Sequence, residues 1–219
     1  MSVDKTPSET RSNHNWRGKV GGLWNEIGIL QFEFMRSQGM QPYHKLLDVG
    51  CGCLRGGVHF VKYLNDGHYY GIDKNSELLD RGRDAELTLA GLENRTIHLI
   101  CNDLFQFSEF NTDFDFAIAQ SVFTHLPWDS ILRCLTEIKT VLSTEGRFYA
   151  TFFEDREGKH LFEPLVHQPG GIWTYSDKDP FHYTFSAFTQ MAAKVDLAVE
   201  LIGNWNHPRN QQMMVFTHG

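Results

Sequence analysis

Apolar runs and polar stretches alternate in a regular rhythm from Lys45 onward. Short apolar runs predict strands at 45–50, 68–73, 96–103, 114–121 and 146–154, of which the first and the fourth are expected to be buried. Three intervening segments place apolar residues on one helical face, at 54–66, 75–93 and 127–143. Strands that are separated by helices pair in parallel, so this region predicts a doubly wound sheet with helices on both faces.

The rhythm stops on both sides of this core. Residues 1–44 form a polar tail followed by an apolar cap helix at 23–35, and residues 155–183 hold prolines, paired glycines and aromatics without periodicity, as is typical of a lid. A helix at 184–196 and two strands joined by "NHPRN" end the chain. We therefore expect a single α/β domain with a Rossmann-like core at 45–154, a lid at 155–183, and a helix and antiparallel edge hairpin at 184–219 that complete a mostly parallel, seven-stranded sheet.

Composition and charge argue against several classes of protein. With 219 residues, 41% of them hydrophobic, the chain is long enough for one domain with its own core. The net charge of −7 argues against a nucleic-acid partner, and no apolar run suggests a membrane span or a secretory signal. The four cysteines lack paired spacing, so we expect no disulfide framework, no metal site and a cytoplasmic location.

The most informative stretch is "LLDVGCGCLRGG" at 46–57, a strand followed by a glycine-rich loop. Such loops let a backbone approach a nucleotide-like ligand. The spacing G-x-G-x-x-x-G-G departs from the dinucleotide fingerprint G-x-G-x-x-G, and Asp48 precedes the first glycine. A carboxylate there would repel a pyrophosphate, but it suits a ligand with a cationic group such as S-adenosylmethionine (SAM), which carries an ammonium and a sulfonium.

The chain resembles the class I SAM-dependent methyltransferases. The resemblance is clear over residues 45–154, which include this loop, and looser over the rest of the chain to residue 219. "LLDVGCGCLRGG" resembles their first motif, "YYGID" the strand with the ribose-binding acid, "ICNDLFQF" the adenine-side motif and "FDFAIAQSVFTHLP" the fourth strand with its exit. One departure is Cys53, which stands where many members have a third glycine. The resemblance implies SAM as cofactor and S-adenosylhomocysteine (SAH) as product.

The resemblance also implies roles for individual residues. Gly50 and Gly52 would let backbone amides approach the cofactor, Asp73 would accept hydrogen bonds from the ribose hydroxyls, and Asp103 would bind the adenine amino group. Asp73 could instead cap the helix that begins near 75, and Asp103 could close a turn. The remaining cofactor contacts that it implies are Asp48, Cys51, Lys74, Leu104 and Gln120.

Candidates for the acceptor side come from the segments around the strand ends. His125, just past the fourth strand, is suited to general-base work, although a packed or helix-capping histidine is an equal alternative. His182, at the end of the lid, is a second candidate base. Candidate acceptor-binding residues are the polar Arg55, His207 and Arg209 and the aromatic Trp24, Trp173 and Tyr175.

These features predict methyl transfer by direct displacement to a small polar acceptor. A histidine base favours an oxygen atom, for instance on a sugar or secondary metabolite; nitrogen and sulfur acceptors stay open because they need little base help. The strand exit "AQSV" lacks the Asn/Asp-Pro-Pro-aromatic motif of enzymes that methylate base amino groups. The alternative of a nicotinamide-dependent oxidoreductase would need the six-residue glycine fingerprint, and a short-chain version would need a Tyr-x-x-x-Lys motif. This sequence contains neither. A non-catalytic cofactor-binding module is the remaining alternative, and the oligomeric state is left open.

Overall fold

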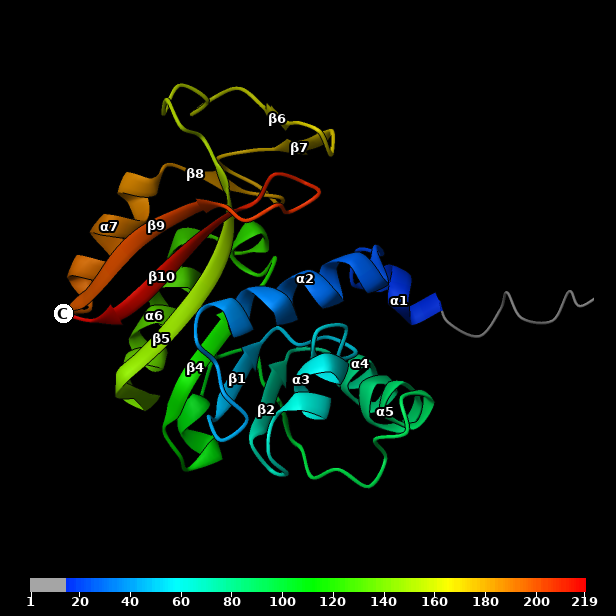
Figure 1. Cartoon of the computed structure of the whole chain (residues 1–219). Coiled ribbons are helices and arrows are strands. Elements are labelled where there is room, and N and C mark those ends of the chain that lie inside the picture. Colours follow the sequence, from blue (N-terminus) through cyan, green and yellow to red (C-terminus); the bar gives the residue numbers. More distant parts are fainter. Residues whose placement is uncertain (1–14) are drawn as a thin grey trace, which may run out of the picture.

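Seven strands form a continuous path in the order β3-β2-β1-β4-β5-β10-β9, and β8 pairs with β5 off this path (Figure 1). The structure is a computed structural model that describes residues 15–219. Residues 1–14 of the predicted polar tail lie outside the described residues. The order of the strands and the antiparallel β9–β10 hairpin confirm the predicted doubly wound sheet.

Strands β1, β2 and β4 are short and mostly buried, as their apolar runs predict, whereas β3 is only partly buried and β5 is long with exposed residues in its first half. β1 pairs in parallel with β2 and β4, β2 with β3, and β4 with β5, so their carboxyl ends meet at one edge of the sheet. β10 then pairs antiparallel with both β5 and β9. The bounds of these strands are Leu46–Val49 (β1), Tyr69–Asp73 (β2), His98–Cys101 (β3), Phe114–Ala119 (β4), Leu142–Glu154 (β5), Leu197–Asn204 (β9) and Gln212–His218 (β10).

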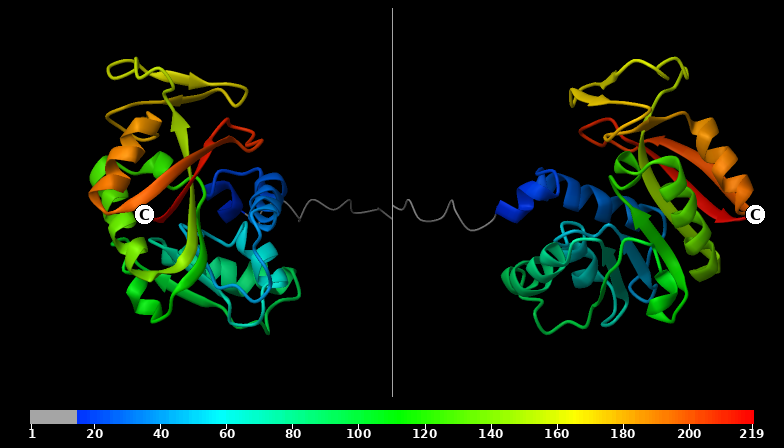
Figure 2. Two further views of the ribbon diagram at one scale, coloured as in Figure 1. Left: turned by 60° about the vertical axis from the view of Figure 1, so that its left-hand side comes forward. Right: turned by 180° about the vertical axis from the view of Figure 1, so that it is seen from behind.

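Helices cover both faces of the sheet (Figure 2). On one face, α6 (Trp128–Val141) and α7 (Phe185–Lys194) bury an apolar stripe against β1, β4, β5 and β10. On the other face, α2 (Trp24–Ser37) and α3 (Gly57–Tyr63) pack with the segment made of α4 (Ser76–Arg81) and α5 (Leu87–Leu89). The result is a three-layer α/β/α arrangement, and two hydrophobic cores lie on opposite faces of one sheet.

Three elements differ from the sequence prediction. The predicted helix at 54–66 begins only at Gly57, because Leu54 adopts a left-handed conformation with φ 65° in the turn before it. The predicted helix at 75–93 contains a π-helical turn, Gly82–Glu86. The lid is not structureless: β6 (Leu165–His167) and β7 (Ile172–Thr174) form a small antiparallel hairpin, and β8 (His182–Tyr183) returns to the end of β5.

Both ends of the chain contribute segments to the carboxyl edge of the sheet. The link at 206–210 between β9 and β10, drawn in red in Figure 1, projects between the lid hairpin and the N-terminal helices α1 (Asn15–Lys19) and α2. An added Cβ at Gly170, in the turn of the lid hairpin, would lie 2.8 Å from the Cα of Arg209 in this link. The edge is therefore bordered by the N-terminal segment, the lid and the link.

Candidate functional site

The glycine loop after β1 is folded tightly against two neighbouring segments. Gly50 and Gly52 have φ values of +69° and +54°, which disfavour residues with side chains. A Cβ at Gly50 would lie 2.5 Å from Val122 Cγ2, and one at Gly52 would lie 2.7 Å from Val20 Cγ1. Glycine is therefore favoured at both positions, because the exit of β4 and the N-terminal segment pack closely on the loop there.

Asp73 ties this loop to the end of β2. Its Oδ2 accepts a hydrogen bond of 2.9 Å from the Gly52 amide, and its Oδ1 accepts one of 2.9 Å from the Asn75 amide. Helix α4 is capped by the Asn75 side chain, which accepts from the Leu78 amide at 3.3 Å. The predicted alternative, Asp73 as the helix cap, is therefore wrong. Each carboxylate oxygen retains a further acceptor site for a ligand hydroxyl.

Asp48 lies beneath the loop rather than on its surface. The carboxylate is buried, with 4% of its area exposed, and its Oδ2 accepts a hydrogen bond of 2.8 Å from the Tyr69 hydroxyl. Burial raises the pKa of Asp48 to about 7, and the nearby charge of Asp73 adds to the effect. Cys51 is buried next to it, and burial raises the pKa of its thiol far above the ordinary value.

The predicted adenine side is organised by a residue that sequence reasoning missed. Asn102 Oδ1 accepts hydrogen bonds from the amides of Leu104, at 2.8 Å, and Gln106, at 3.4 Å, and so forms the turn after β3. The side chains of Asp103 and Leu104 are exposed on this turn, and Lys74 is exposed at the end of β2. Asp103 is therefore available to a ligand, because Asn102 and not Asp103 closes the turn.

A short N-terminal strap, residues 16–22, lies over the glycine loop. Its anchor is Glu86, which is only 2% exposed. Arg17 donates from Nε to Glu86 Oε1 at 2.7 Å and from Nη2 to Oε2 at 2.6 Å, and Trp16 Nε1 donates to Oε1 at 2.8 Å. A buried carboxylate with a bidentate guanidinium partner is a strong local anchor. The sequence signal for it was weak, since Glu86 lies in a helix whose other polar residues face solvent.

Arg55 holds the strap from below, and this corrects its predicted place in the acceptor pocket. The side chain is 92% buried, and Nη1 donates to the carbonyls of Val20 at 2.7 Å and Gly22 at 2.9 Å. Its Nη2 donates to Gln120 Oε1 at 2.7 Å, while Nε has no partner among the described residues. Burial and the charge of Arg209 lower the pKa of Arg55 to about 10. The guanidinium is engaged with the protein's own backbone.

Gln120 and the β9–β10 link continue this buried polar network. Gln120 Nε2 lies 2.5 Å from Ser121 Oγ and 3.1 Å from His207 Nε2. His207 is buried and stacks on Trp205, and burial lowers its pKa to about 3, so the ring is neutral at physiological pH. Arg209 donates from Nη2 to the carbonyl of Gly21 in the strap. Of the predicted acceptor contacts, Arg209 therefore joins the link to the strap, and His207 joins the link to Gln120.

His125 is the predicted base that the structure leaves accessible. It ends the 3-10 helix η3 (Phe123–His125), and its side chain is 56% exposed. Its Nδ1 lies 2.5 Å from Oδ1 of Asp179, a lid residue that sequence reasoning missed. The packed or helix-capping alternative does not describe this side chain, which is half exposed and paired with a carboxylate.

His182, the second predicted base, is instead part of the interior of the lid. The ring is 3% exposed; its Nδ1 lies 2.9 Å from Thr174 Oγ1, and its Nε2 donates to the carbonyl of His160 at 3.0 Å. Thr174 Oγ1 also lies 2.9 Å from His167 Nε2. Both ring nitrogens of His182 are used inside the lid, so His182 is a structural residue in this conformation.

The predicted aromatic cover is dispersed rather than gathered in one pocket. Trp24, at the start of α2, packs under the guanidinium of Arg17, with its ring centroid 4.5 Å from Cζ. Trp173 is 55% exposed on β7, and Tyr175 lies under Lys178, whose Nζ is 4.2 Å from the ring centroid. Trp24 therefore belongs to the strap and the other two to the lid, and these three do not form a single wall.

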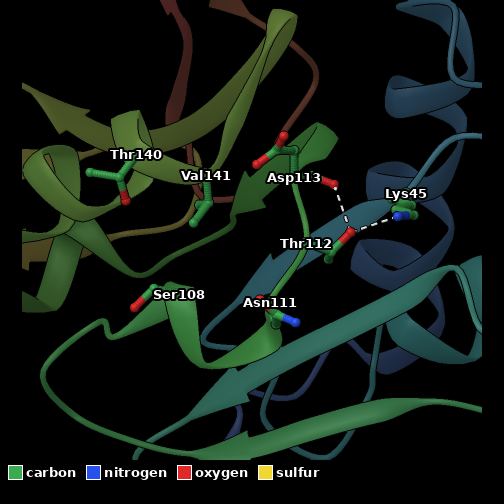
Figure 3. Close-up of a pocket in the computed structure, with 7 residues that line it drawn as sticks. All are labelled: Lys45, Ser108, Asn111, Thr112, Asp113, Thr140 and Val141. Carbon is green, nitrogen blue, oxygen red and sulfur yellow. Dashed lines mark hydrogen bonds between the residues drawn. The ribbon is translucent and has the colours of Figure 1, made fainter.

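Two hollows lie outside the site. The larger, about 500 Å³, opens at the amino ends of β1 and β4, at the opposite edge of the sheet (Figure 3). In it, Lys45 Nζ donates to Thr112 Oγ1 at 2.6 Å. The smaller, about 340 Å³, lies between the end of β5, the lid and the link, and neither His125 nor the glycine loop lines it. Within the described part of the chain, no group of three or more His, Cys, Asp or Glu side chains gathers as a metal site.

Comparison with known proteins finds similarity in sequence over the core and in overall fold. Residues 46–146 match the model of a family described as a methyltransferase domain. Similar solved structures include a SAM-dependent methyltransferase from Clostridium acetobutylicum (10% identity, 94% of this chain and 97% of that chain, TM-score 0.67). Others are a TehB-like SAM-dependent methyltransferase from Corynebacterium glutamicum (22%, 93% and 92%, 0.60) and the magnesium protoporphyrin IX methyltransferase from Synechocystis with bound SAM (11%, 88% and 81%, 0.62). These structures share the fold of this chain.

Proposed function

We propose that this chain, which belongs to the class I SAM-dependent methyltransferases, transfers a methyl group to an oxygen atom of a small polar acceptor, with His125 as the general base. The observation that carries the proposal is the position of His125. Val122 contacts the glycine loop at Gly50, and the amide of His125 donates to the carbonyl of Val122 at 2.9 Å in a 3-10 turn. Residues i and i+3 eclipse in such a turn, so His125 follows Val122 on the same face, about 6 Å further along.

The residues around the glycine loop fit the cofactor. Gly50 and Gly52 hold the loop in a left-handed conformation at the carboxyl edge of the sheet, and the Gly52 amide binds Asp73, so the loop and this acid lie together where the cofactor would bind. Asp73 has spare acceptor capacity for the two ribose hydroxyls, and Asp103 is exposed on the turn where the adenine would lie. Asp48 beneath the loop would favour the cationic methionine end. When bound, SAM supplies a methyl group on a sulfonium centre.

The chain's own residues would then align and deprotonate the acceptor. The neutral imidazole of His125 would accept the hydroxyl proton as the oxygen attacks, and general-base help of this kind is worth roughly 10²- to 10⁴-fold in rate. The strap and the lid would exclude water from the two halves of the site, and alignment supplies much of the remaining acceleration. A nitrogen or sulfur acceptor, which needs less base help, is the alternative that the same site could serve.

The nature of the acceptor and the location of the protein are inferred from charge and cysteine chemistry. A net charge of −7 disfavours a nucleic-acid acceptor, and the lid and strap favour a small molecule. All four cysteines are free, in keeping with a cytoplasmic location. Among the described residues, no helix is long and apolar enough to cross a membrane.

Calorimetry followed by an acceptor screen tests the proposal. The protein is titrated with SAM and SAH, with NADH as the control for a nucleotide that should not bind. It is then incubated with SAM and panels of hydroxyl, amine and thiol compounds, and SAH release is measured. Micromolar binding of SAM and SAH alone, with turnover on hydroxyl compounds that depends on His125, would support the proposal. Binding of NADH in preference to SAM, or turnover only on amines or thiols, would overturn it.

A further inference from the structure

The lid contributes an acid to the base that the proposed function assigns. Oδ1 of Asp179 lies 2.5 Å from Nδ1 of His125, although the two residues are 54 positions apart in the sequence. Both side chains are slightly more than half exposed, at 56% and 57%, so neither is buried by the pairing. The contact therefore does not serve the core, and its effect falls on the orientation of the histidine ring.

The position of Asp179 is fixed by the way the lid docks on η3. The amide of Phe181 donates to the carbonyl of Thr124 at 2.7 Å, and the hydroxyl of Tyr183 donates to the carbonyl of Leu126 at 2.8 Å. The rings of Phe181 and Tyr183 stack with centroids 6.1 Å apart, as expected for residues two apart in an extended segment. Asp179 lies two residues before Phe181, in the bend that leads into β8, and the docking of Phe181 on Thr124 brings its carboxylate beside the ring of His125.

The loop that carries Asp179 is closed at its base. The amide of Tyr175 donates to the carbonyl of Pro180 at 2.8 Å, and the amide of His182 donates to the carbonyl of Tyr175 at 2.9 Å. His182 in turn is buried and hydrogen bonded on both ring nitrogens. The buried histidine thus gives the loop a rigid base, from which Asp179 reaches out to η3.

From this geometry we propose that Asp179 is the positioning residue for His125, and that the general base is complete only when the lid is docked. This inference rests on the proposed function, because it needs His125 to act as the base. A carboxylate that accepts from Nδ1–H holds the neutral ring in the tautomer whose Nε2 carries the free lone pair. That nitrogen can then take the acceptor's proton, and the carboxylate stabilises the imidazolium that forms.

The first test reads the tautomer directly and needs no acceptor. Protein labelled with ¹⁵N-histidine is saturated with SAH, and the ring nitrogens of His125 are assigned by comparison with His125→Gln. We expect wild-type His125 to carry its proton on Nδ1 and Asp179→Asn to lose this preference. Asp177→Asn is the matched control, since Asp177 is an exposed carboxylate on the same loop without a hydrogen-bond partner in the described structure. A tautomer that is the same in wild type and Asp179→Asn would overturn the inference.

The second test uses the acceptor found by the screen. Asp179→Asn is expected to lower kcat about tenfold with KM for the acceptor within twofold, because it disturbs the base and not the binding surface; Asp177→Asn should match wild type. A kcat equal to wild type would reject Asp179 as a positioning residue while leaving the proposed methyl transfer intact. Failure of SAM to bind wild type would instead reject the proposed function, and the tautomer of His125, measured without SAH, would still decide the pairing with Asp179.

Discussion

The two halves of the carboxyl edge of the sheet are built on different physical principles. Over the glycine loop, which we call the cofactor half, the strap is held by charged groups: Arg17 on the buried Glu86, and Arg55 and Arg209 on strap carbonyls. Over η3, the acceptor half, the lid is held by a backbone amide and a tyrosine hydroxyl, and its interior is joined by hydrogen bonds between His182 and Thr174. Charged side chains thus hold the strap on the cofactor half. On the acceptor half, the lid supplies Asp179, the partner of the candidate base His125.

The largest effect on activity is expected when the candidate base is removed. His125→Ala is expected to lower kcat about 100-fold or more, because the hydroxyl proton loses its acceptor. The affinity for SAM should stay within twofold of wild type, since His125 lies on the acceptor half. Steady-state kinetics and calorimetry on the same preparation check both expectations. Equal turnover of variant and wild type would show that the acceptor needs no base from this residue.

The pH dependence of stability tests whether the buried carboxylate of Asp48 destabilises the folded protein when it is charged. Because the pKa of Asp48 is raised from its ordinary value to about 7 in the folded protein, the folded state binds the proton more tightly than the unfolded state does between about pH 4 and 7. Wild type therefore loses stability as pH rises through that window.

Asp48→Asn should lack this loss. Its advantage in the free energy of unfolding should grow from near zero at pH 4 to on the order of 2–4 kcal/mol above pH 7. Urea denaturation at pH 4.5, 6 and 8 measures the difference. At the same time SAM should bind the variant more weakly, because the cationic end of the ligand loses a carboxylate. A difference in stability between Asp48→Asn and wild type that does not change with pH would contradict a raised pKa of Asp48 in the folded protein.

Asp73 gives the counterpart to the His125 experiment. Asp73→Asn keeps the size of the side chain and one acceptor oxygen, but removes the charged acceptor for the ribose hydroxyls. We expect SAM affinity to fall about 30- to 100-fold, which corresponds to the roughly 2–3 kcal/mol of hydrogen bonds to a charged group. At saturating SAM, kcat should stay near wild type. The two variants together would then separate binding from chemistry; a kcat defect at saturation would show that the halves are coupled.

The smallest expected effect concerns the strap. Glu86→Gln removes the charge that binds Arg17, so the strap should detach more often and SAM should bind a few-fold more weakly. Limited trypsin digestion at Lys19 should accelerate for the same reason. Glu77→Gln is the matched control, because Glu77 pairs with Lys19 in the same strap through an exposed contact of 3.0 Å, and exposed ion pairs contribute little. Equal rates of cleavage at Lys19 in the two variants would show that Glu86 does not anchor the strap.

Sequence reasoning reached the fold and the cofactor half largely through local signals. The apolar stripe that predicts the helix at 127–143 includes Ile131, Leu135 and Ile138, all of them fully buried in α6. Gly50 and Gly52 were identified from their spacing, and both need positive φ and the absence of a Cβ. These signals are local because they come from hydrophobic periodicity and from the conformational freedom of a single residue type.

Residues whose roles depend on distant partners were assigned less well. Arg55 and His207 are polar residues near strand ends, and sequence alone offered them as acceptor contacts; burial and the strap carbonyls give them other roles. His182 has the residue type of a base, but its two ring nitrogens are bonded inside the lid. No spacing rule predicts such contacts, because the partners come from segments with no fixed relation along the chain.

The sequence by itself determined the alternation of strands and helices, the glycine loop and the acids at the strand ends, because each follows from backbone preference and hydrophobic period within a few residues. The tertiary structure alone decided which histidine is accessible and which is buried, which carboxylate meets it, and which cations hold the strap. These outcomes depend on desolvation and on hydrogen bonds between residues such as His125 and Asp179, 54 positions apart, and only folding brings those groups together.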